Sequence, residues 1–250
     1  MKIAVVSITK HGIAQAGKVV AALPGAQLFA PEKFRAEAEL AAPAAAHCYE
    51  GKVGEQVPAL FVAFDAIVCI VSLGAVVRLI APHLQNKESD PAVVVVDEAG
   101  KFAIPVLSGH LGGANALAGH LATALGATPV LTTASDARAT IGVDILGREL
   151  GWRFEATHDE IVRCSAAMVN DEPVALVQEA GSRDWWASHA NGRQGPLPGN
   201  VTLFELLEEI DPAQFSAVLW ISERQEHELP EALAKSLAGK RVIYRPGTVV

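Results

Sequence analysis

A short glycine-rich segment, residues 108–113, has the residue types of a ligand site. It reads Ser-Gly-His-Leu-Gly-Gly and stands between an apolar run that predicts a strand, residues 104–107, and a pattern that predicts a helix. Gly109, Gly112 and Gly113 permit positive φ angles and remove side chains that would block a ligand. Since N–H groups at the start of a helix attract anions, we expect a phosphate or a carboxylate to bind here.

Two side chains of this segment have the chemistry for a reaction. His110 carries an imidazole, the group that suits general acid–base catalysis near neutral pH, although a histidine at a helix start also commonly bonds a backbone carbonyl. Ser108 is a weaker candidate for a nucleophile because it lacks the G-x-S-x-G elbow. We expect further ligand contacts from Asn115, Thr132 and Thr133.

A second polar turn follows another predicted strand. Ser72 and Gly74 lie between an apolar run at residues 66–71 and a predicted helix at 75–80, and Arg78 follows one helical turn later. Open α/β sheets bind ligands at the carboxyl ends of their strands, so we expect this turn to share one rim with the glycine-rich segment. The charged residues expected beside it are Lys87, Asp90, Asp97 and Glu98.

The acidic pair Asp97 and Glu98 has two interpretations: catalytic carboxylates, or solvated charges in a tight connection. The glycine spacing matches neither the dinucleotide fingerprint G-x-G-x-x-G nor a Walker A loop, which makes a nucleotide the least favoured ligand. No His, Asp or Glu cluster has metal-ligand spacing in the sequence. We therefore expect no metal cofactor held by the chain itself.

The elements that would position these residues alternate between strand and helix, which predicts an α/β fold. We expect an open, mostly parallel, doubly wound sheet of the flavodoxin or Rossmann type, with a hairpin between the apolar runs 92–96 and 102–107. The pattern changes after Asp136. It predicts an N-terminal α/β domain over residues 1–136, which carries the signature turns, and a second, smaller α/β domain over 137–250.

Two segments have less regular patterns. Residues 36–46 are rich in alanine and are interrupted by Pro43, which indicates a loose helix or a connector. Residues 141–150 have apolar positions at helical spacing and predict a helix.

Composition excludes several classes of partner. The net charge of −8 argues against a nucleic acid, which is usually bound by basic patches. The apolar runs are shorter than the roughly 20 residues that a spanning helix needs. Three widely separated cysteines indicate reduced thiols. We expect a cytoplasmic protein that binds neither nucleic acid nor membrane.

The block over residues 74–136, which contains SGHLGGANALAGHLATALGATPVLTT, closely resembles the cobalt-precorrin-5A hydrolase family, the CbiG proteins of anaerobic cobalamin biosynthesis. Residues 137 to about 237 are similar to the family's middle domain. The resemblance implies hydrolysis of the δ-lactone of cobalt-precorrin-5A, with acetaldehyde released as cobalt-precorrin-5B forms. It also implies that cobalt arrives within the tetrapyrrole substrate and that no separate cofactor is needed.

The substrate implied by this resemblance is a flat macrocycle fringed with carboxylates, which suits two glycine-containing helix starts together with Arg78 and Lys87. We hypothesise that His110, or Asp97 and Glu98, activates water. N–H groups of residues 108–113 would then stabilise the oxyanion.

Two alternatives to a self-sufficient hydrolase stay open. Family members continue into a C-terminal domain, whereas this sequence stops at Val250. In the first alternative, the chain is a corrinoid-binding or assembly module that needs a partner. That partner is a separate C-terminal-domain protein or another enzyme of the cobalamin pathway. The other alternative is a nucleotide-binding α/β protein. The sequence is compatible with a homo-oligomer as well as with a monomer.

Overall fold

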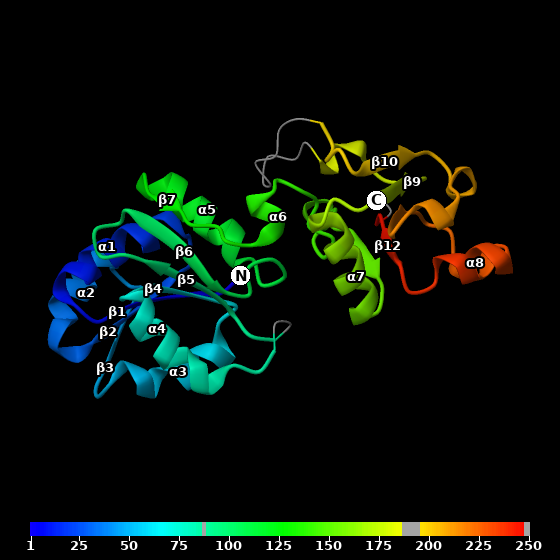
Figure 1. Ribbon diagram of the computed structural model, residues 1–250. Coiled ribbons are helices and arrows are strands. Elements are labelled where there is room, and N and C mark those ends of the chain that lie inside the picture. The colour runs from blue at the N-terminus through cyan, green and yellow to red at the C-terminus, as the bar shows by residue number, and fades with distance from the viewer. Residues whose placement is uncertain (87–88, 187–195, 248–250) are drawn as a thin grey trace. The chain divides into compact units, whose positions relative to one another are not determined.

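The computed structural model describes residues 1–86, 89–186 and 196–247, and its contacts divide the chain into two compact units. The first unit comprises Met1–Leu131 and the second Thr132–Val250 (Figure 1). This division falls a few residues before the boundary predicted at 136. Among the described residues, no helix combines the length and the apolar character that a bilayer crossing requires.

The first unit is built on a seven-stranded sheet with the order β3-β2-β1-β4-β5-β6-β7. β1 to β5 run parallel, β6 runs antiparallel to β5, and β7 runs parallel to β6. The strands are β1 (Ile3–Ser7), β2 (Gln27–Pro31), β3 (Ala46–Tyr49), β4 (Ala66–Ile70), β5 (Ala92–Val96), β6 (Phe102–Leu107) and β7 (Thr128–Pro129).

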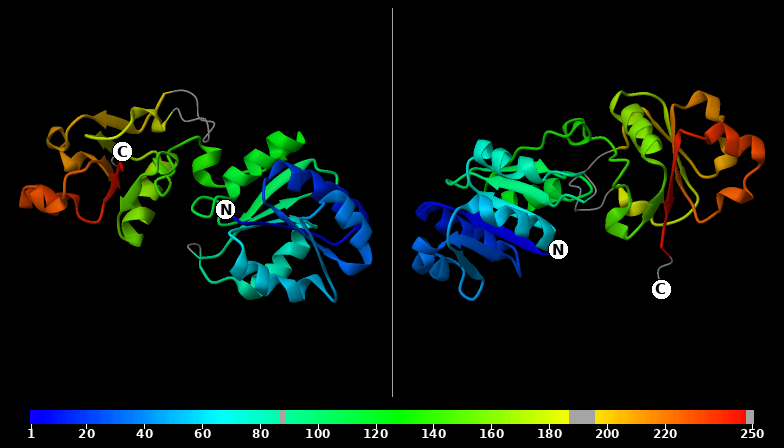
Figure 2. Two further views of the ribbon diagram at one scale, coloured as in Figure 1. Left: turned by 180° about the vertical axis from the view of Figure 1, so that it is seen from behind. Right: turned by 90° about the horizontal axis from the view of Figure 1, so that it is seen from below.

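Helices cover both faces of this sheet (Figures 1 and 2). One face packs against α1 (Lys10–Ala22), α2 (Arg35–Ala41) and α5 (Ala114–Leu125). The other packs against α3 (Val53–Ala63) and α4 (Leu73–Ile80). The predicted open, mostly parallel, doubly wound α/β fold is confirmed.

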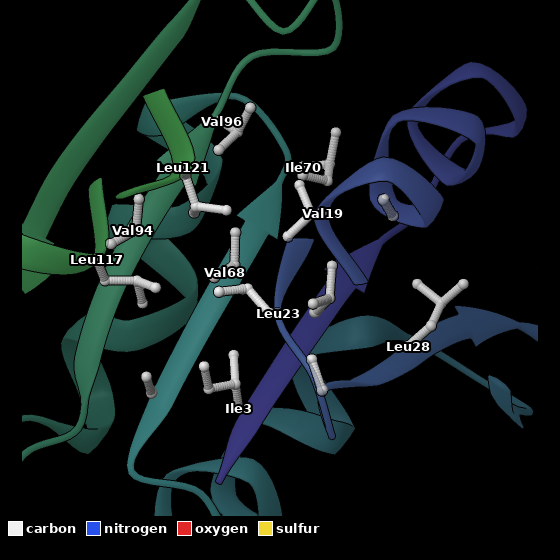
Figure 3. Packing of buried hydrophobic residues seen from close by; sticks show 14 of the residues in the cluster. Ile3, Val19, Leu23, Leu28, Val68, Ile70, Val94, Val96, Leu117 and Leu121 are labelled. Carbon is white, nitrogen blue, oxygen red and sulfur yellow. The ribbon is translucent and has the colours of Figure 1, made fainter. Parts of the chain in front are cut away.

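The core of the first unit forms because its central strands are apolar on both sides. β1, β4 and β5 are buried at every position, as expected for strands that are covered by helices on both faces. Figure 3 shows one face, where Val68 and Val94 of the sheet pack with Val19 of α1 and with Leu117 and Leu121 of α5. This packing fixes where α1 and α5 begin relative to the strand ends.

The hairpin between β5 and β6 reverses the direction of the sheet. Val93 lies opposite Leu107, and Val96 lies opposite Ala103. We call the edge at which β1 to β5 end the C-terminal rim, and the edge at which they start the N-terminal rim. Because β6 is antiparallel, it ends at the N-terminal rim, and the glycine-rich loop at residues 108–113 lies there.

The second unit contains a five-stranded sheet with the order β10-β9-β11-β12-β8, in which only β8 is antiparallel to its neighbour. Its strands are β8 (Arg153–Glu155), β9 (Val174–Gln178), β10 (Val201–Phe204), β11 (Ala217–Ile221) and β12 (Arg241–Arg245). Its α-helices are α6 (Ala134–Ala137), α7 (His158–Val169) and α8 (Glu231–Leu237). The predicted second α/β domain is therefore present.

Short 3-10 turns complete both units. In the first unit they are Glu32–Phe34 and Ala81–His83. In the second they are Arg148–Leu150, Arg183–Trp185, Leu207–Glu209, Pro212–Gln214 and Glu226–Glu228.

One local prediction is wrong, and one strand was not predicted. Residues 141–150 form turns and a short 3-10 segment instead of an α-helix, because Gly147 takes a φ of +71° with its Cα packed against Trp152. Of the two interpretations of the alanine-rich segment, the helix is confirmed as α2, and the strand β3 that begins at its last residue was not predicted. β3 lies at the edge of the first sheet and extends it beside β2.

Candidate functional site

The glycine-rich loop has a tightly determined conformation. Ser108 adopts a φ of +54°, unusual for a residue with a side chain, and its hydroxyl donates a hydrogen bond of 2.9 Å to the backbone oxygen of Asp90. Gly112 lies so close to Ser108 that a Cβ at Gly112 would stand 2.3 Å from the Ser108 Cβ. Gly113 precedes α5 with a φ of +86°. Strained backbone of this kind is often found at functional sites.

The loop uses several of its own N–H groups internally. The N–H of Gly113 donates to the oxygen of His110 at 3.0 Å, that of Ala114 to Ser108 at 3.1 Å, and that of Asn115 to Gly109 at 3.0 Å. The first donors of α5 are therefore committed to the fold of the loop. These three N–H groups are therefore not available to an oxyanion.

Replacing Gly112 by Ala is expected to lower the free energy of unfolding by about 1–3 kcal/mol, because the new methyl group forces the loop away from Ser108. Thermal unfolding of the purified chain measures this. Gly119→Ala is the matched control: it lies inside α5 with nothing within 4 Å of the added Cβ, and should stabilise by up to about 1 kcal/mol. Equal melting temperatures for Gly112→Ala and the unmodified chain would contradict the close packing.

Asp97 and Glu98 lie at the other end of β5, on the C-terminal rim. The Asp97 carboxylate accepts hydrogen bonds of 2.7 Å from the N–H groups of Lys101 and Phe102, and so holds the hairpin together. Glu98 is exposed and accepts a hydrogen bond of 2.9 Å from the Thr9 hydroxyl. The two carboxylates therefore differ: Asp97 stabilises the turn, and Glu98 faces solvent at the rim.

Ser72, Gly74 and Arg78 also lie at the C-terminal rim, where α4 follows β4. All three are exposed, and the Arg78 guanidinium donates to the backbone oxygen of Gly74 at 2.9 Å. Because β4 neighbours β1, the start of α4 is placed beside the start of α1. The strand order reverses between these two strands, and such switch points are where open α/β sheets form their ligand crevices.

The start of α1 adds residues that sequence reasoning did not select. Thr9 caps this helix, its hydroxyl accepting from the N–H of Gly12 at 3.0 Å while donating to Glu98. Ser7, at the end of β1, is fully buried, and its hydroxyl has no hydrogen-bond partner among the described residues. The sequence did contain a signal for this helix start: Thr9, a residue type that commonly caps helices, directly follows the apolar run at residues 3–8.

The expected convergence of the two polar turns on one crevice is wrong. The glycine-rich loop lies at the N-terminal rim, whereas Ser72, Gly74 and Glu98 lie at the C-terminal rim. The five residues of β5 separate the rims by roughly 15 Å. Among the predicted charged residues that the structure describes, Asp90 is placed beside the loop, through its backbone oxygen.

Three further predicted contacts lie outside the described part of the first unit. Thr132 and Thr133 belong to the second unit, where the Thr133 hydroxyl donates to the Asp136 carboxylate. Lys87 lies outside the described residues.

Two of the three cysteines, Cys69 and Cys164, are buried and unsuited to nucleophilic chemistry. Burial raises the pKa of the Cys69 thiol to about 12 and that of the Cys164 thiol to about 11, so both stay protonated at neutral pH. Within the described parts of the chain, no three His, Cys, Asp or Glu side chains gather as a metal ion would require.

Comparison with known proteins gives consistent matches over both units. The family model for the cobalamin synthesis G N-terminal region, CbiG_N, matches residues 55–136, and that for the cobalamin biosynthesis central region, CbiG_mid, matches residues 141–246. The chain is 38% identical over 243 residues to a cobalt-precorrin-5A hydrolase of Priestia megaterium, covering 97% of this chain and 62% of the relative.

A second relative and a solved structure extend the comparison. The chain is 33% identical over 233 residues to the cobalt-precorrin-5A hydrolase of Salmonella typhimurium, covering 92% of this chain and 60% of the relative. A crystal structure of a cobalamin biosynthesis protein G homologue from Sulfolobus solfataricus aligns with a TM-score of 0.49 at 21% identity, covering 98% of this chain and 60% of that one. The chain thus spans about 60% of the length of the curated relatives it matches. It belongs to the cobalamin synthesis G (CbiG) family, of which it carries the N-terminal and central regions.

Proposed function

We propose that this chain acts in anaerobic cobalamin biosynthesis in the hydrolysis of cobalt-precorrin-5A, opening its δ-lactone and releasing acetaldehyde to give cobalt-precorrin-5B. The observation that carries the proposal is the 38% identity to a cobalt-precorrin-5A hydrolase over 97% of the chain, a span that includes both units. Cobalt is part of the substrate in this proposal.

The proposed reaction needs a base and a site for developing negative charge. Water adds to the lactone carbonyl and the ring C–O bond breaks, which leaves a carboxylate and an alcohol. The alcohol then loses its proton and its C–C bond to the macrocycle, and acetaldehyde leaves. The macrocycle keeps the electron pair of that bond and takes up a proton. A general base therefore accelerates both steps, and N–H donors stabilise the oxyanion of the first.

The C-terminal rim supports this chemistry better than the glycine-rich loop. It brings Glu98, held by Thr9, beside the start of α1, and places the start of α4 next to it. Both helix starts carry partial positive charge for an oxyanion, and Arg78 on α4 supplies a cation for a substrate carboxylate. In the glycine-rich loop at the other rim, several N–H groups already donate hydrogen bonds to backbone oxygens of the loop. We therefore assign Glu98 as the base.

The test is incubation of the purified chain with cobalt-precorrin-5A. We expect one acetaldehyde per corrinoid, measured by coupling to an alcohol dehydrogenase, together with the corresponding loss of mass from the corrinoid. Binding of the lactone without acetaldehyde would instead identify a corrinoid-binding module that needs a partner protein for catalysis. If the chain neither binds the lactone nor releases acetaldehyde, the proposed function is refuted.

A further inference from the structure

The tip of the β5–β6 hairpin, residues 97–100, reaches across the C-terminal rim to helix α1. Thr9 stands two residues beyond the end of β1, Glu98 stands two residues beyond the end of β5, and β4 lies between these strands. Neighbouring strands are about 4.8 Å apart, so β1 and β5 are separated by about 10 Å. The hydrogen bond of 2.9 Å from the Thr9 hydroxyl to Glu98 Oε1 therefore spans the end of β4.

The hairpin tip is held in one conformation by its own hydrogen bonds. The N–H of Gly100 donates to the backbone oxygen of Asp97 at 2.8 Å. The Asp97 carboxylate in turn accepts from the N–H groups of Lys101 and Phe102, both at 2.7 Å. Glu98 lies within this turn, so its backbone is fixed relative to the sheet although its side chain is exposed.

A second contact docks the tip on α1. Gly100 takes a φ of +67°, and a Cβ at this position would stand 2.4 Å from Nε2 of Gln15. Gln15 belongs to α1 and is 6% exposed. Because only a glycine allows this close approach, the tip packs directly on the helix. The bond between Thr9 and Glu98 is therefore one of two contacts that fix the tip against α1.

The Thr9 hydroxyl is engaged as both acceptor and donor. It accepts a hydrogen bond of 3.0 Å from the N–H of Gly12, at the start of α1. A hydroxyl has a single hydrogen, and that of Thr9 is directed to Glu98 Oε1. The first turn of α1 thus orients Thr9, and Thr9 orients the carboxylate.

One oxygen of Glu98 is left for chemistry. Within residues 1–86, 89–186 and 196–247, the hydrogen bond from Thr9 is the only hydrogen bond or ion pair that reaches this carboxylate. Thr9 occupies Oε1. Oε2 is therefore the oxygen that can accept a proton from a water molecule.

We propose that Thr9 is the positioning residue of the general base. It holds the Glu98 carboxylate by Oε1, so that Oε2 takes a proton from the water whose oxygen bonds to the lactone carbonyl carbon, while the C=O electron pair moves onto the carbonyl oxygen. The inference rests on the proposed function, which supplies the lactone and the base. Since Thr9 acts through Glu98, loss of its O–H group should lower kcat and leave KM nearly unchanged.

Thr9→Asp is the test, because an ionised aspartate caps a helix as well as a threonine does but has no proton to donate to a second carboxylate. With cobalt-precorrin-5A as substrate, we expect kcat for acetaldehyde release to fall about tenfold or more, the loss typical of a hydrogen bond to a charged group. KM should stay within about twofold. Thr9→Ser keeps both the cap and the donor, and should restore kcat to within about threefold of the unmodified chain.

Thr157→Asp is the matched control, in the second unit. Thr157 caps α7, where its hydroxyl accepts from the N–H of Glu160 at 3.3 Å and donates to the Glu160 carboxylate at 3.0 Å. The same exchange of cap and loss of donor at this position should change kcat by less than about twofold. Thermal unfolding of Thr9→Asp should match that of the unmodified chain because the cap of α1 is kept, which excludes a folding defect.

The outcomes separate this inference from the proposed function. Thr9→Asp is also measured in the Glu98→Gln background, in single turnovers, where a residue that acts only through Glu98 has no further effect on the rate. If Thr9→Asp keeps the full rate, or lowers it equally in both backgrounds, the inference is wrong and the proposed function stands. If Glu98→Gln alone keeps the full rate, the inference fails together with the assigned base. If the unmodified chain releases no acetaldehyde, the proposed function fails and the inference with it.

Discussion

Glu98→Gln is expected to lower acetaldehyde release from cobalt-precorrin-5A by about a hundredfold or more, the range over which a positioned general base contributes. The substitution is nearly isosteric, and its amide oxygen can still accept the hydrogen bond from Thr9. The cap of α1 is therefore kept while the basic group is lost. Initial rates at saturating substrate measure the effect.

His110→Asn provides the opposing measurement. His110 lies in the glycine-rich loop, at the N-terminal rim, roughly 15 Å from Glu98 along β5. A single lactone carbonyl cannot contact both groups, so we expect His110→Asn to lower the rate by less than about tenfold. The reverse result, a large loss at His110 and a small one at Glu98, would move the reaction to the glycine-rich loop and reject our assignment of the base.

Glu179→Ala is expected to destabilise the second unit by about 3–5 kcal/mol, a large part of the stability of a typical domain. The Glu179 carboxylate follows β9 and is 7% exposed. It accepts hydrogen bonds from the Trp220 indole at 2.9 Å, the Ser222 hydroxyl at 2.7 Å, the Arg224 guanidinium at 2.9 Å and the Leu207 N–H at 3.0 Å. Truncation leaves all four donors without this acceptor, which is why the expected cost is high.

Urea unfolding monitored by tryptophan fluorescence measures this change selectively, because all four tryptophans lie in the second unit. Glu205→Ala is the control. Its carboxylate pairs with Arg183 on the surface, with both side chains more than half exposed, and its loss should cost no more than about 1 kcal/mol. Similar midpoints for the two variants would show that the buried carboxylate does not hold this sheet together.

Most elements of the first unit are predictable because their signals are local. β1, β4 and β5 are short apolar runs next to turn residues, and α1 and α5 have apolar faces of helical period. β3 has no such signal: its four residues include an exposed histidine and follow an alanine-rich stretch. Its pairing with β2 at the sheet edge makes it a strand, and sequence patterns do not report that contact.

The site was harder to predict because it depends on strand direction. The predicted hairpin after β5 was correct, and a hairpin necessarily sends the next strand backwards. Ser108 follows this reversed strand and Ser72 follows a parallel one, so the two residues lie on opposite rims. The hydrogen bond between Thr9 and Glu98 joins residues that are far apart in the sequence, and no local pattern predicts it. Residue types therefore indicated the chemistry, but topology decided which of these residues share a rim.

Strand β7 has a consequence for how the protein behaves at high concentration. Thr128 and Val130 direct their N–H groups inward, to Lys101 and Ala103 of the neighbouring chain segment. The residue between them, whose N–H would point outward, is Pro129, which has none. The open edge of the sheet thus offers no donor at its central position to a strand from another molecule. Pro129, in the shortest strand of the sheet, therefore disfavours edge-to-edge aggregation through β7.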